Sequence, residues 1–377
     1  MIVFFAIVLI LLTWWLHRRL VRATAMPRPW SLMVDVLLVV FAVLAAIGLS
    51  TGRVLNPAVF RAPAFLGLTW LAALLYLGLG VIIIGIGSLL WRLVARLSGH
   101  SPGAARLRAV RISTAIVAIG AVVATAYGVL EAHSPRTTTT SITLPGLPTQ
   151  FDGVRVALIS DLHVGPARGR AFTKKVVDQV NATHPDLIVI AGDVTDGTVA
   201  NTADAITPLA ELSAPLGVFG VSGNHEFYSD DGGAWLDEWE RLGVRTLRNQ
   251  RVEVSRNGAS IDVVGIHDYS APAPYQPDLP AALDGSDPQR FALLLAHEPR
   301  QAEQASQLGI DVQLSGHTHG GQLWPIRYLV SLQQPSVQGL DRIGDTALYT
   351  TFGAGAWGPP VRVGAPPEIA LVQLRRG

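Results

Sequence analysis

Hydrophobic residues dominate the first third of the chain and occur only in short runs after it. Four long apolar segments lie at residues 2–16, 31–50, 64–91 and 110–130. A helix needs about 20 apolar residues to cross the hydrocarbon core of a bilayer, so residues 1–132 are predicted to form a bundle of about four transmembrane helices. The first segment is short, and a cleaved signal peptide is the alternative interpretation. Arg18 and Arg19 follow its apolar run instead of preceding it, which favours a span.

Arginine residues are unevenly distributed among the connections between these segments. The connections after the first and third segments contain Arg18, Arg19, Arg22, Arg28, Arg92, Arg96, Arg106, Arg108 and Arg111. The connection after the second segment has only Arg53 and Arg61. Positively charged loops stay in the cytoplasm. We therefore expect a multi-pass protein of the cell membrane whose C-terminal domain is extracytoplasmic.

Beyond residue 132 the pattern changes to short β-branched runs. Residues 133–150 contain a threonine run and prolines, and are predicted to be a linker. The predicted strands are Val154–Ile159, Leu187–Ile190, Val218–Val221, Ile261–Ile266, Phe291–Leu295, Val312–Leu314, Ala347–Thr350 and Ile369–Leu374. Helical spacing occurs at 172–182, 202–212 and 234–242. This alternation predicts an α/β domain over residues 151–377, with helices covering one sheet or two packed sheets.

Composition excludes several functional classes. The chain has 377 residues, enough for two domains, and a net charge of +1. A charge so close to neutral gives no bulk attraction for nucleic acid, so no nucleic-acid partner is expected. The chain has no cysteine, which excludes disulfides, thiolate metal ligands and cysteine nucleophiles.

Polar motifs rich in Asp, His and Asn follow five of the predicted strands. They are Asp161-Leu162-His163, Gly192-Asp193, Gly223-Asn224-His225-Glu226, His297 and Gly316-His317-Thr318-His319. Ligands collect at the carboxyl ends of strands in α/β domains, so these motifs are expected to meet at one point. Each imidazole alone would be interpreted as a hydrogen-bonded core histidine, but the five motifs together favour a metal site. Carboxylate, amide and imidazole groups bind divalent metals, and two such metals can hold a phosphate for hydrolysis.

This ordered set of motifs resembles the signature of calcineurin-like metallophosphoesterases, over about residues 142–377. The flanking segments Ser160–Gly165, Gly316–Gln322 and Gly353–Pro360 are similar to YkuE-type bacterial phosphoesterases, which are often membrane-anchored. The resemblance implies an α/β (α+β) four-layer fold, in which two packed β-sheets are flanked by helices. It also implies two divalent metal ions, and the ligands are compatible with manganese, iron or zinc.

The resemblance implies a role for each motif residue. The ligands are Asp161, His163 and His319 for the first metal, Asn224, His297 and His317 for the second, and Asp193 as a bridge between the two. His225 is expected to contact the substrate phosphate and to act as general acid, oriented by a nearby acidic residue. Asn224 is expected to take part in catalysis as well as in metal binding. Gln322 directly follows the last motif and is a candidate substrate ligand.

The predicted function is that of a metal-dependent phosphoric ester hydrolase (phosphodiesterase or phosphatase) that cleaves ester or pyrophosphate bonds by attack of a metal-bridged hydroxide. The membrane anchor favours a phosphorylated lipid or cell-envelope substrate. The alternative is a membrane sensor, scaffold or transport protein with a non-catalytic metal-binding domain, and the intact motifs weigh against it. Residues Trp324, Leu329, Val330 and Leu332 are predicted to form either ordinary core or an apolar wall beside the metals.

Overall fold

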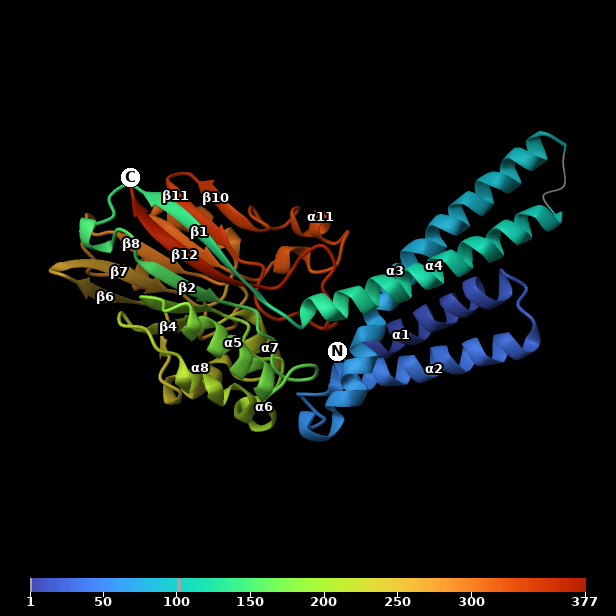
Figure 1. Ribbon diagram of the computed structural model, residues 1–377, viewed down its shortest axis with the longest axis horizontal. Coiled ribbons are helices and arrows are strands. Elements are labelled where there is room, and N and C mark those ends of the chain that lie inside the picture. Colours follow the sequence, from blue (N-terminus) through green and yellow to red (C-terminus); the bar gives the residue numbers. More distant parts are fainter. Residues whose placement is uncertain (1, 100–102) are drawn as a thin grey trace.

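A helix bundle and an α/β domain lie end to end in the computed structural model, which describes residues 2–99 and 103–377 (Figure 1). The helices of the bundle are α1 (Ile2–His17), α2 (Arg28–Ser50), α3 (Pro57–Leu97) and α4 (Gly103–Ala132). Within the described residues, α2, α3 and α4 are long and apolar enough to cross a membrane. The first predicted span coincides with α1, which has only 16 residues.

The two arginine-rich connections lie at the same end of the bundle. The α1–α2 connection and the facing ends of α3 and α4 are far from the domain, whereas the α2–α3 loop faces it (Figure 1). Arg111 joins the two connections by donating to the carbonyl oxygens of Thr24 (2.7 Å) and Ala25 (3.0 Å). Helix α3 has 41 residues, more than the predicted segment 64–91. At about 1.5 Å per residue it is roughly twice as long as the bilayer core is thick.

Two six-stranded sheets pack face to face in the domain. The first has the order β1 (Arg136–Leu144), β12 (Glu368–Arg376), β2 (Arg155–Ile159), β3 (Leu187–Ala191), β4 (Val218–Val221) and β5 (Arg245–Thr246). The second has the order β10 (Gly339–Ile343), β11 (Thr346–Thr350), β9 (Val312–Ser315), β8 (Ala292–Leu295), β7 (Ala259–Gly265) and β6 (Gln250–Arg256). Strands β2 to β5 are parallel, and so are β7, β8, β9 and β11.

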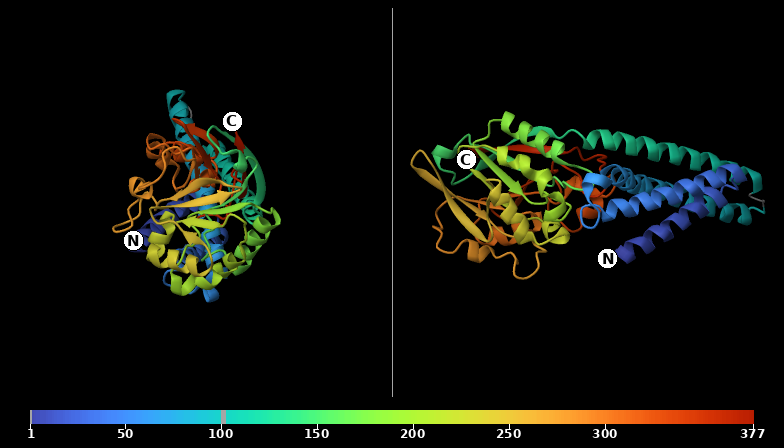
Figure 2. Two further views of the ribbon diagram at one scale, coloured as in Figure 1. Left: turned by 90° about the vertical axis from the view of Figure 1, so that its left-hand side faces the viewer. Right: turned by 90° about the horizontal axis from the view of Figure 1, so that it is seen from below.

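Helices cover the outer faces of both sheets. Helices α5 (Arg170–Ala182), α6 (Val199–Ile206) and α8 (Gly232–Arg241) pack on the first sheet, where Trp235 and Val177 join a buried cluster with Ile188. Helices α9 (Leu279–Ala282) and α10 (Ala302–Gln307) cover the second. Leu158 and Leu293 belong to the core between the sheets. These four layers confirm the predicted fold, and Figure 2 shows the domain and bundle from two further sides.

The segment predicted to be a linker is part of the first sheet. Within residues 133–150, strand β1 pairs in parallel with β12 from Arg136 to Leu144, so the linker prediction is wrong. Threonine is β-branched and favours strands, and here it forms an edge strand beside the last strand of the chain. The predicted helix 202–212 is also divided. Helix α6 ends at Ile206, and a 3-10 turn that contains Pro208 follows it.

Candidate metal centre

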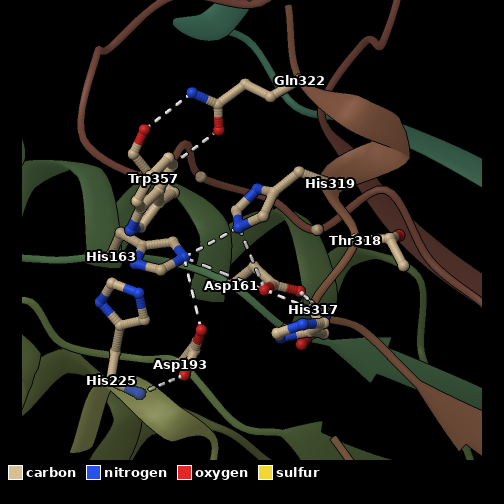
Figure 3. Close-up of polar contacts among 12 residues, drawn as sticks. Asp161, His163, Asp193, His225, His317, Thr318, His319, Gln322 and Trp357 are labelled. Atoms are coloured by element: carbon tan, nitrogen blue, oxygen red, sulfur yellow. Dashed lines mark hydrogen bonds and ion pairs between the residues drawn. The ribbon is translucent and has the colours of Figure 1, made fainter. Parts of the chain in front are cut away.

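The predicted metal ligands lie on loops that leave the carboxyl ends of five strands. Asp161 follows β2, Asp193 follows β3, Asn224 begins α7 (Asn224–Ser229) after β4, His297 follows β8, and His317 and His319 follow β9. Parallel strands present their carboxyl ends at one edge, and both sheets present theirs to the same place. The structure therefore brings all seven predicted ligands and His225 together at one centre, and Figure 3 labels six of these residues.

Five residues of this centre have left-handed backbone conformations. The φ angles are 58° at Asp161, 48° at His163, 54° at Asp193, 70° at His317 and 52° at His319. This conformation costs a residue other than glycine about 1–2 kcal/mol. Strained backbone tends to occur at functional sites, where the surrounding structure holds it in place. The turns after β2, β3 and β9 thus hold these side chains in position even though the local conformation is unfavourable.

Asp161, His163 and His319 form the first cluster. Nε2 of His319 lies 3.2 Å from Oδ1 of Asp161 and 2.9 Å from Nε2 of His163 (Figure 3). The Asp161 carboxylate also accepts a hydrogen bond from the backbone N–H of His317 at 3.1 Å. One ligand atom from each of the three side chains lies within 4.8 Å of the others, which is close enough for a single ion.

Asn224, His297 and His317 form the second cluster. Oδ1 of Asn224 lies 3.2 Å from Nε2 of His297 and 3.0 Å from Nδ1 of His317. Asp193 lies between the two clusters, with Oδ2 3.2 Å from Nε2 of His297 and 3.8 Å from Nε2 of His163. Its other oxygen accepts from the backbone N–H of His225 at 2.8 Å. Asp193 is therefore placed to serve both clusters.

Two of the imidazoles are held with one nitrogen facing the centre. Nδ1 of His163 lies 2.9 Å from the Asp196 carboxylate, and Nδ1 of His297 lies 2.6 Å from the carbonyl oxygen of Ala191. Both partners are hydrogen-bond acceptors, so the neutral ring carries its proton on Nδ1. The lone pair on Nε2 then points into the centre, which is the arrangement that metal-ligating histidines adopt.

The charges of the centre also fit a cation. Asp161 and Asp193 are buried, and among the described residues they form ion pairs only with histidines. Burial opposes ionisation of Asp161, yet His319 holds the pKa of this carboxyl below its usual range. Burial lowers the pKa of His317 to about 4 and that of His319 to about 3. Both imidazoles are thus neutral at pH 7, so the positive charge that the two buried carboxylates need would come from bound metal ions or from His225 and His297, whose pKa values Asp193 raises despite burial.

Asp196 connects His225 to the first cluster. Its Oδ1 lies 2.6 Å from Nδ1 of His225 and 2.9 Å from Nδ1 of His163. Burial would lower the pKa of His225, but Asp193 and Asp196 outweigh that effect and raise it to about 9. An acidic residue near His225 could be expected from the sequence, and the structure shows that it is Asp196. The signal available in the sequence was the position of Asp196, three residues after Asp193.

Glu226 joins two of the motif loops. Its buried carboxylate accepts hydrogen bonds from the backbone N–H groups of Gly223 (2.8 Å), Asp193 (3.0 Å), Val194 (2.9 Å) and Thr195 (3.3 Å). Four donors on one carboxylate fix the loop after β3 against the start of α7. Glu226 therefore supports the positions of Asp193 and Asn224 without facing the clusters.

Arg362 lies behind His319 and was not identified from the sequence. Its side chain is completely buried. The guanidinium donates to the carbonyl oxygens of His319 (2.8 Å), Phe352 (2.8 Å) and Gly355 (2.9 Å), and one nitrogen lies 3.0 Å from Nδ1 of His319. These contacts join the His319 turn to the loop before β12. Nothing in the local sequence marks this arginine, because its partners are distant along the chain.

The amide of Gln322 is occupied by a neighbouring loop. It accepts from the backbone N–H of Trp357 (2.8 Å) and donates to the carbonyl oxygens of Trp357 (2.7 Å) and Pro359 (3.1 Å) (Figure 3). Both N–H bonds of the amide are thereby used. Gln322 holds the Trp357 loop beside the centre, where the indole and the His225 ring are 6.3 Å apart. A direct contact of Gln322 with substrate stays a prediction.

Residues after Gln322 are too exposed to be ordinary core. The exposed fractions of Trp324, Leu329 and Leu332 are 55%, 60% and 79%. Val330 lines a cavity that also includes His317. Of the two predictions for this segment, the core interpretation is wrong for these three exposed residues, whereas Val330 belongs to a wall beside the metal centre.

The sequence of this chain is similar to those of known metallophosphoesterases. The family described as Calcineurin-like phosphoesterase matches residues 154–321. A Danio rerio protein named "Transmembrane protein with metallophosphoesterase domain" is 34% identical over 330 residues, covering 81% of this chain and 74% of its own. An Aquifex aeolicus metallophosphoesterase is 31% identical, covering 68% of this chain and 97% of its own. The Bacillus subtilis metallophosphoesterase YkuE is 31% identical, covering 65% of this chain and 87% of its own.

The similarity to the Danio rerio protein extends beyond the domain. It covers 81% of the chain, which is more than residues 133–377 comprise, so part of the helix bundle is included. The relative is named as a transmembrane protein, and three helices here are long and apolar enough to cross a bilayer. This is a membrane protein, and it belongs to the calcineurin-like metallophosphoesterase family.

Proposed function

We propose that this protein is a membrane-anchored phosphoesterase that uses two divalent metal ions to hydrolyse phosphate ester or pyrophosphate bonds. The observation that carries the proposal is the pair of three-residue clusters on either side of Asp193. A single metal would need only one of these clusters. Two adjacent clusters with one carboxylate between them suit two ions that share a ligand.

The residues of each cluster would hold one ion. Asp161, His163 and His319 would bind the first, Asn224, His297 and His317 the second, and Asp193 would bridge them. Carboxylate, imidazole and amide-oxygen ligands are suitable for manganese, iron or zinc. When bound, the two cations would neutralise charge on the phosphate and supply a nucleophilic water that ionises near neutral pH.

His225 would donate the proton that the leaving oxygen needs. Its imidazole lies beside Asp193 without belonging to either three-residue cluster, and Nδ1 is held by Asp196 at 2.6 Å. The Nε2 atom is left for the substrate. A pKa raised to about 9 keeps the ring protonated at neutral pH, as a general acid requires. Asn224 would contribute through its Oδ1, which lies beside both His297 and His317.

The active site would face the extracytoplasmic side of the cell membrane. Both arginine-rich connections lie at the end of the bundle far from the domain (Figure 1), and such connections stay in the cytoplasm. The domain is attached at the opposite end. Substrates in the outer part of the bilayer or in the cell envelope would then be within reach.

The experiment is a hydrolysis assay on the full-length protein reconstituted in lipid nanodiscs. Bis-p-nitrophenyl phosphate and p-nitrophenyl phosphate report diesterase and monoesterase activity, with Mn²⁺ added or removed by chelation. Hydrolysis of either ester that depends on Mn²⁺ and is lost in Asp193→Asn supports the proposal. Asp284→Asn is the matched control, because Asp284 is exposed and outside the centre. A folded, metal-loaded protein that hydrolyses neither ester would favour the sensor or scaffold alternative.

A further inference from the structure

A single cavity of about 1200 Å³ extends from the metal centre to the helix bundle. At one end it is lined by His163, Asp193, Asn224 and other residues of the centre. At the other end it is lined by Leu49 and further leucines of the bundle. Sites for small ligands usually measure about 300–1000 Å³, so this cavity is larger than a phosphate group alone requires.

The chemical character of the cavity changes along its length. Arg53 of the α2–α3 loop lines the cavity and follows Gly52, whose carbonyl oxygen accepts from Thr198, and the structure gives Arg53 no ion pair among the described residues. Beyond it, Leu49 of α2 and Leu71 and Leu75 of α3 present hydrocarbon side chains, and Leu323 of the domain faces the same space. A ligand that fills the cavity would therefore need an anionic group at one end and an apolar chain at the other.

Direct contacts between bundle and domain hold the walls of this cavity together. The carbonyl oxygen of Gly52, in the α2–α3 loop, accepts from the N–H of Thr198 at 3.0 Å. Helix α4 contributes the carbonyl oxygen of Gly128, which accepts from the N–H of Arg362 at 2.9 Å. Ala72 packs with Leu323 in a buried cluster that spans the junction. The bundle is thus one wall of the site as well as its anchor.

Exposed apolar residues lie on the same side of the domain as the bundle. Trp324, Tyr328, Leu329 and Leu332 are all more than half exposed, and the short helix α11 (Arg327–Val330), which contains two of them, lies on the side of the domain toward the bundle (Figure 1). Aromatic and apolar side chains at the end of a transmembrane bundle are typical of the interface between bilayer and water. This places the cavity beside the membrane surface.

We infer that the substrate is a long-chain phosphoester, whose phosphate binds at the metal centre while its hydrocarbon chain lies against α2 and α3. This inference rests on the proposed phosphoesterase function. It adds that the bundle contributes Leu49, Leu71 and Leu75 to substrate binding, so that chain length determines specificity. Acyl and isoprenoid chains share the chemistry that these walls recognise.

The test compares p-nitrophenyl alkyl phosphodiesters whose alkyl group is ethyl or octyl, with full-length protein in nanodiscs and Mn²⁺. Hydrolysis adds water at phosphorus, releases p-nitrophenolate and leaves the alkyl chain on the phosphate. Burial of one methylene favours binding by up to about fourfold. Taking about twofold for each of the six additional methylenes, we expect kcat/KM to be at least about 60-fold higher for the octyl ester.

Two variants narrow the cavity, and each has a matched control. Leu71→Trp and Leu49→Trp place a larger ring in it, whereas Leu66→Trp and Val39→Trp change exposed positions on the same two helices that do not line it. We expect the cavity variants to lower the octyl-to-ethyl ratio of kcat/KM at least tenfold. We expect the control variants to keep the wild-type ratio. Because the octyl ester partitions into the bilayer in every sample, unchanged control variants also show that partition does not cause the change in the cavity variants.

The possible results separate this inference from the function on which it rests. A ratio that is the same in all five proteins would overturn the inference and leave the phosphoesterase proposal intact. Absence of metal-dependent hydrolysis of both the ethyl and the octyl ester in wild type would instead contradict the proposed function. The p-nitrophenyl phosphodiesters of n-decanol and citronellol, which have ten carbons each, then distinguish a straight acyl-type chain from an isoprenoid chain. A preference for either that disappears in Leu71→Trp supports the inference and identifies the chain.

Discussion

The imidazole Nδ1 of His225 lies 2.6 Å from Oδ1 of Asp196, and the same carboxylate oxygen also holds the imidazole of His163. One acidic residue thereby orients both the proposed general acid and a proposed metal ligand. The two functions of the centre are therefore coupled through Asp196, and its charge and its hydrogen-bonding ability can be separated by substitution.

Asp196→Asn keeps an oxygen acceptor and removes the negative charge. In wild type Asp196 helps to raise the pKa of His225 to about 9, so His225 keeps its proton, and activity persists, until the pH approaches that value. Without the charge the pKa falls, and we expect the alkaline limb of the kcat–pH profile to move down by about one to three pH units. The measurement is kcat from pH 6 to 10 with saturating Mn²⁺. An unshifted alkaline limb would show that Asp196 does not set the protonation of His225.

His225→Ala removes the proposed proton donor while leaving all seven proposed metal ligands. General acid catalysis contributes about 10²–10⁴-fold, and the contribution is largest for a poor leaving group. We expect kcat to fall by about that factor for an alkyl phosphate leaving group and by about tenfold or less for p-nitrophenolate, which leaves without protonation. Equal losses for the two leaving groups, with unchanged metal content, would contradict the assignment.

Gly52→Ala tests the contact between the α2–α3 loop and the Asp196 loop. Gly52 has φ +91°, and an added Cβ would lie 2.6 Å from the carbonyl oxygen of Asp196. We expect the displaced loop to lower kcat about tenfold, which corresponds to about 1.4 kcal/mol in the activation barrier. Gly243→Ala is the control, because Gly243 has φ +86° with no atom near the added Cβ. Similar kinetics for both variants would mean that the contact does not position Asp196.

Glu226→Ala leaves four backbone N–H groups without their acceptor. Each unsatisfied buried donor costs about 1–3 kcal/mol, and water entering the space left by the side chain offsets part of this. We expect the free energy of unfolding to fall by about 3 kcal/mol and the melting temperature of the domain to fall by about 10 °C. Differential scanning calorimetry measures the melting temperature. The control is Glu303→Ala, at an exposed position on α10. A melting temperature equal to that of the control would show that Glu226 does not hold the two loops together.

The ligand motifs could be predicted from the sequence because each lies directly after a hydrophobic strand. A short apolar run followed by Asp, His or Asn carries local information about both the strand and the site, as at Asp161 and His297. The same runs predicted an α/β domain with one sheet or two packed sheets, and the resemblance to the family implied the four layers. Strand β6, which was not predicted, has a single buried residue, Val254, and is rich in polar residues. Strand β1 was mistaken for a linker because the strand with which it pairs, β12, is more than 200 residues away.

Residues that act through distant contacts could not be identified in advance. Arg362 is important because its guanidinium reaches the carbonyl oxygen of His319, 43 residues earlier, and neither segment reveals the other. The same holds for the cavity wall formed by α2 and α3. Their hydrophobicity predicts a membrane span equally well whether or not a face of the helix lines an active site.

The most direct test of the account is the metal content of the purified protein. Full-length wild type, reconstituted with Mn²⁺ and freed of excess metal, is analysed by inductively coupled plasma mass spectrometry beside Asp193→Asn and the control Asp284→Asn. We predict two metal ions per chain in wild type and control, and at most one in Asp193→Asn, with phosphoesterase activity reduced at least about a hundredfold. One ion or none in active wild type, or two ions in Asp193→Asn with full activity, would contradict a centre of two metals bridged by Asp193.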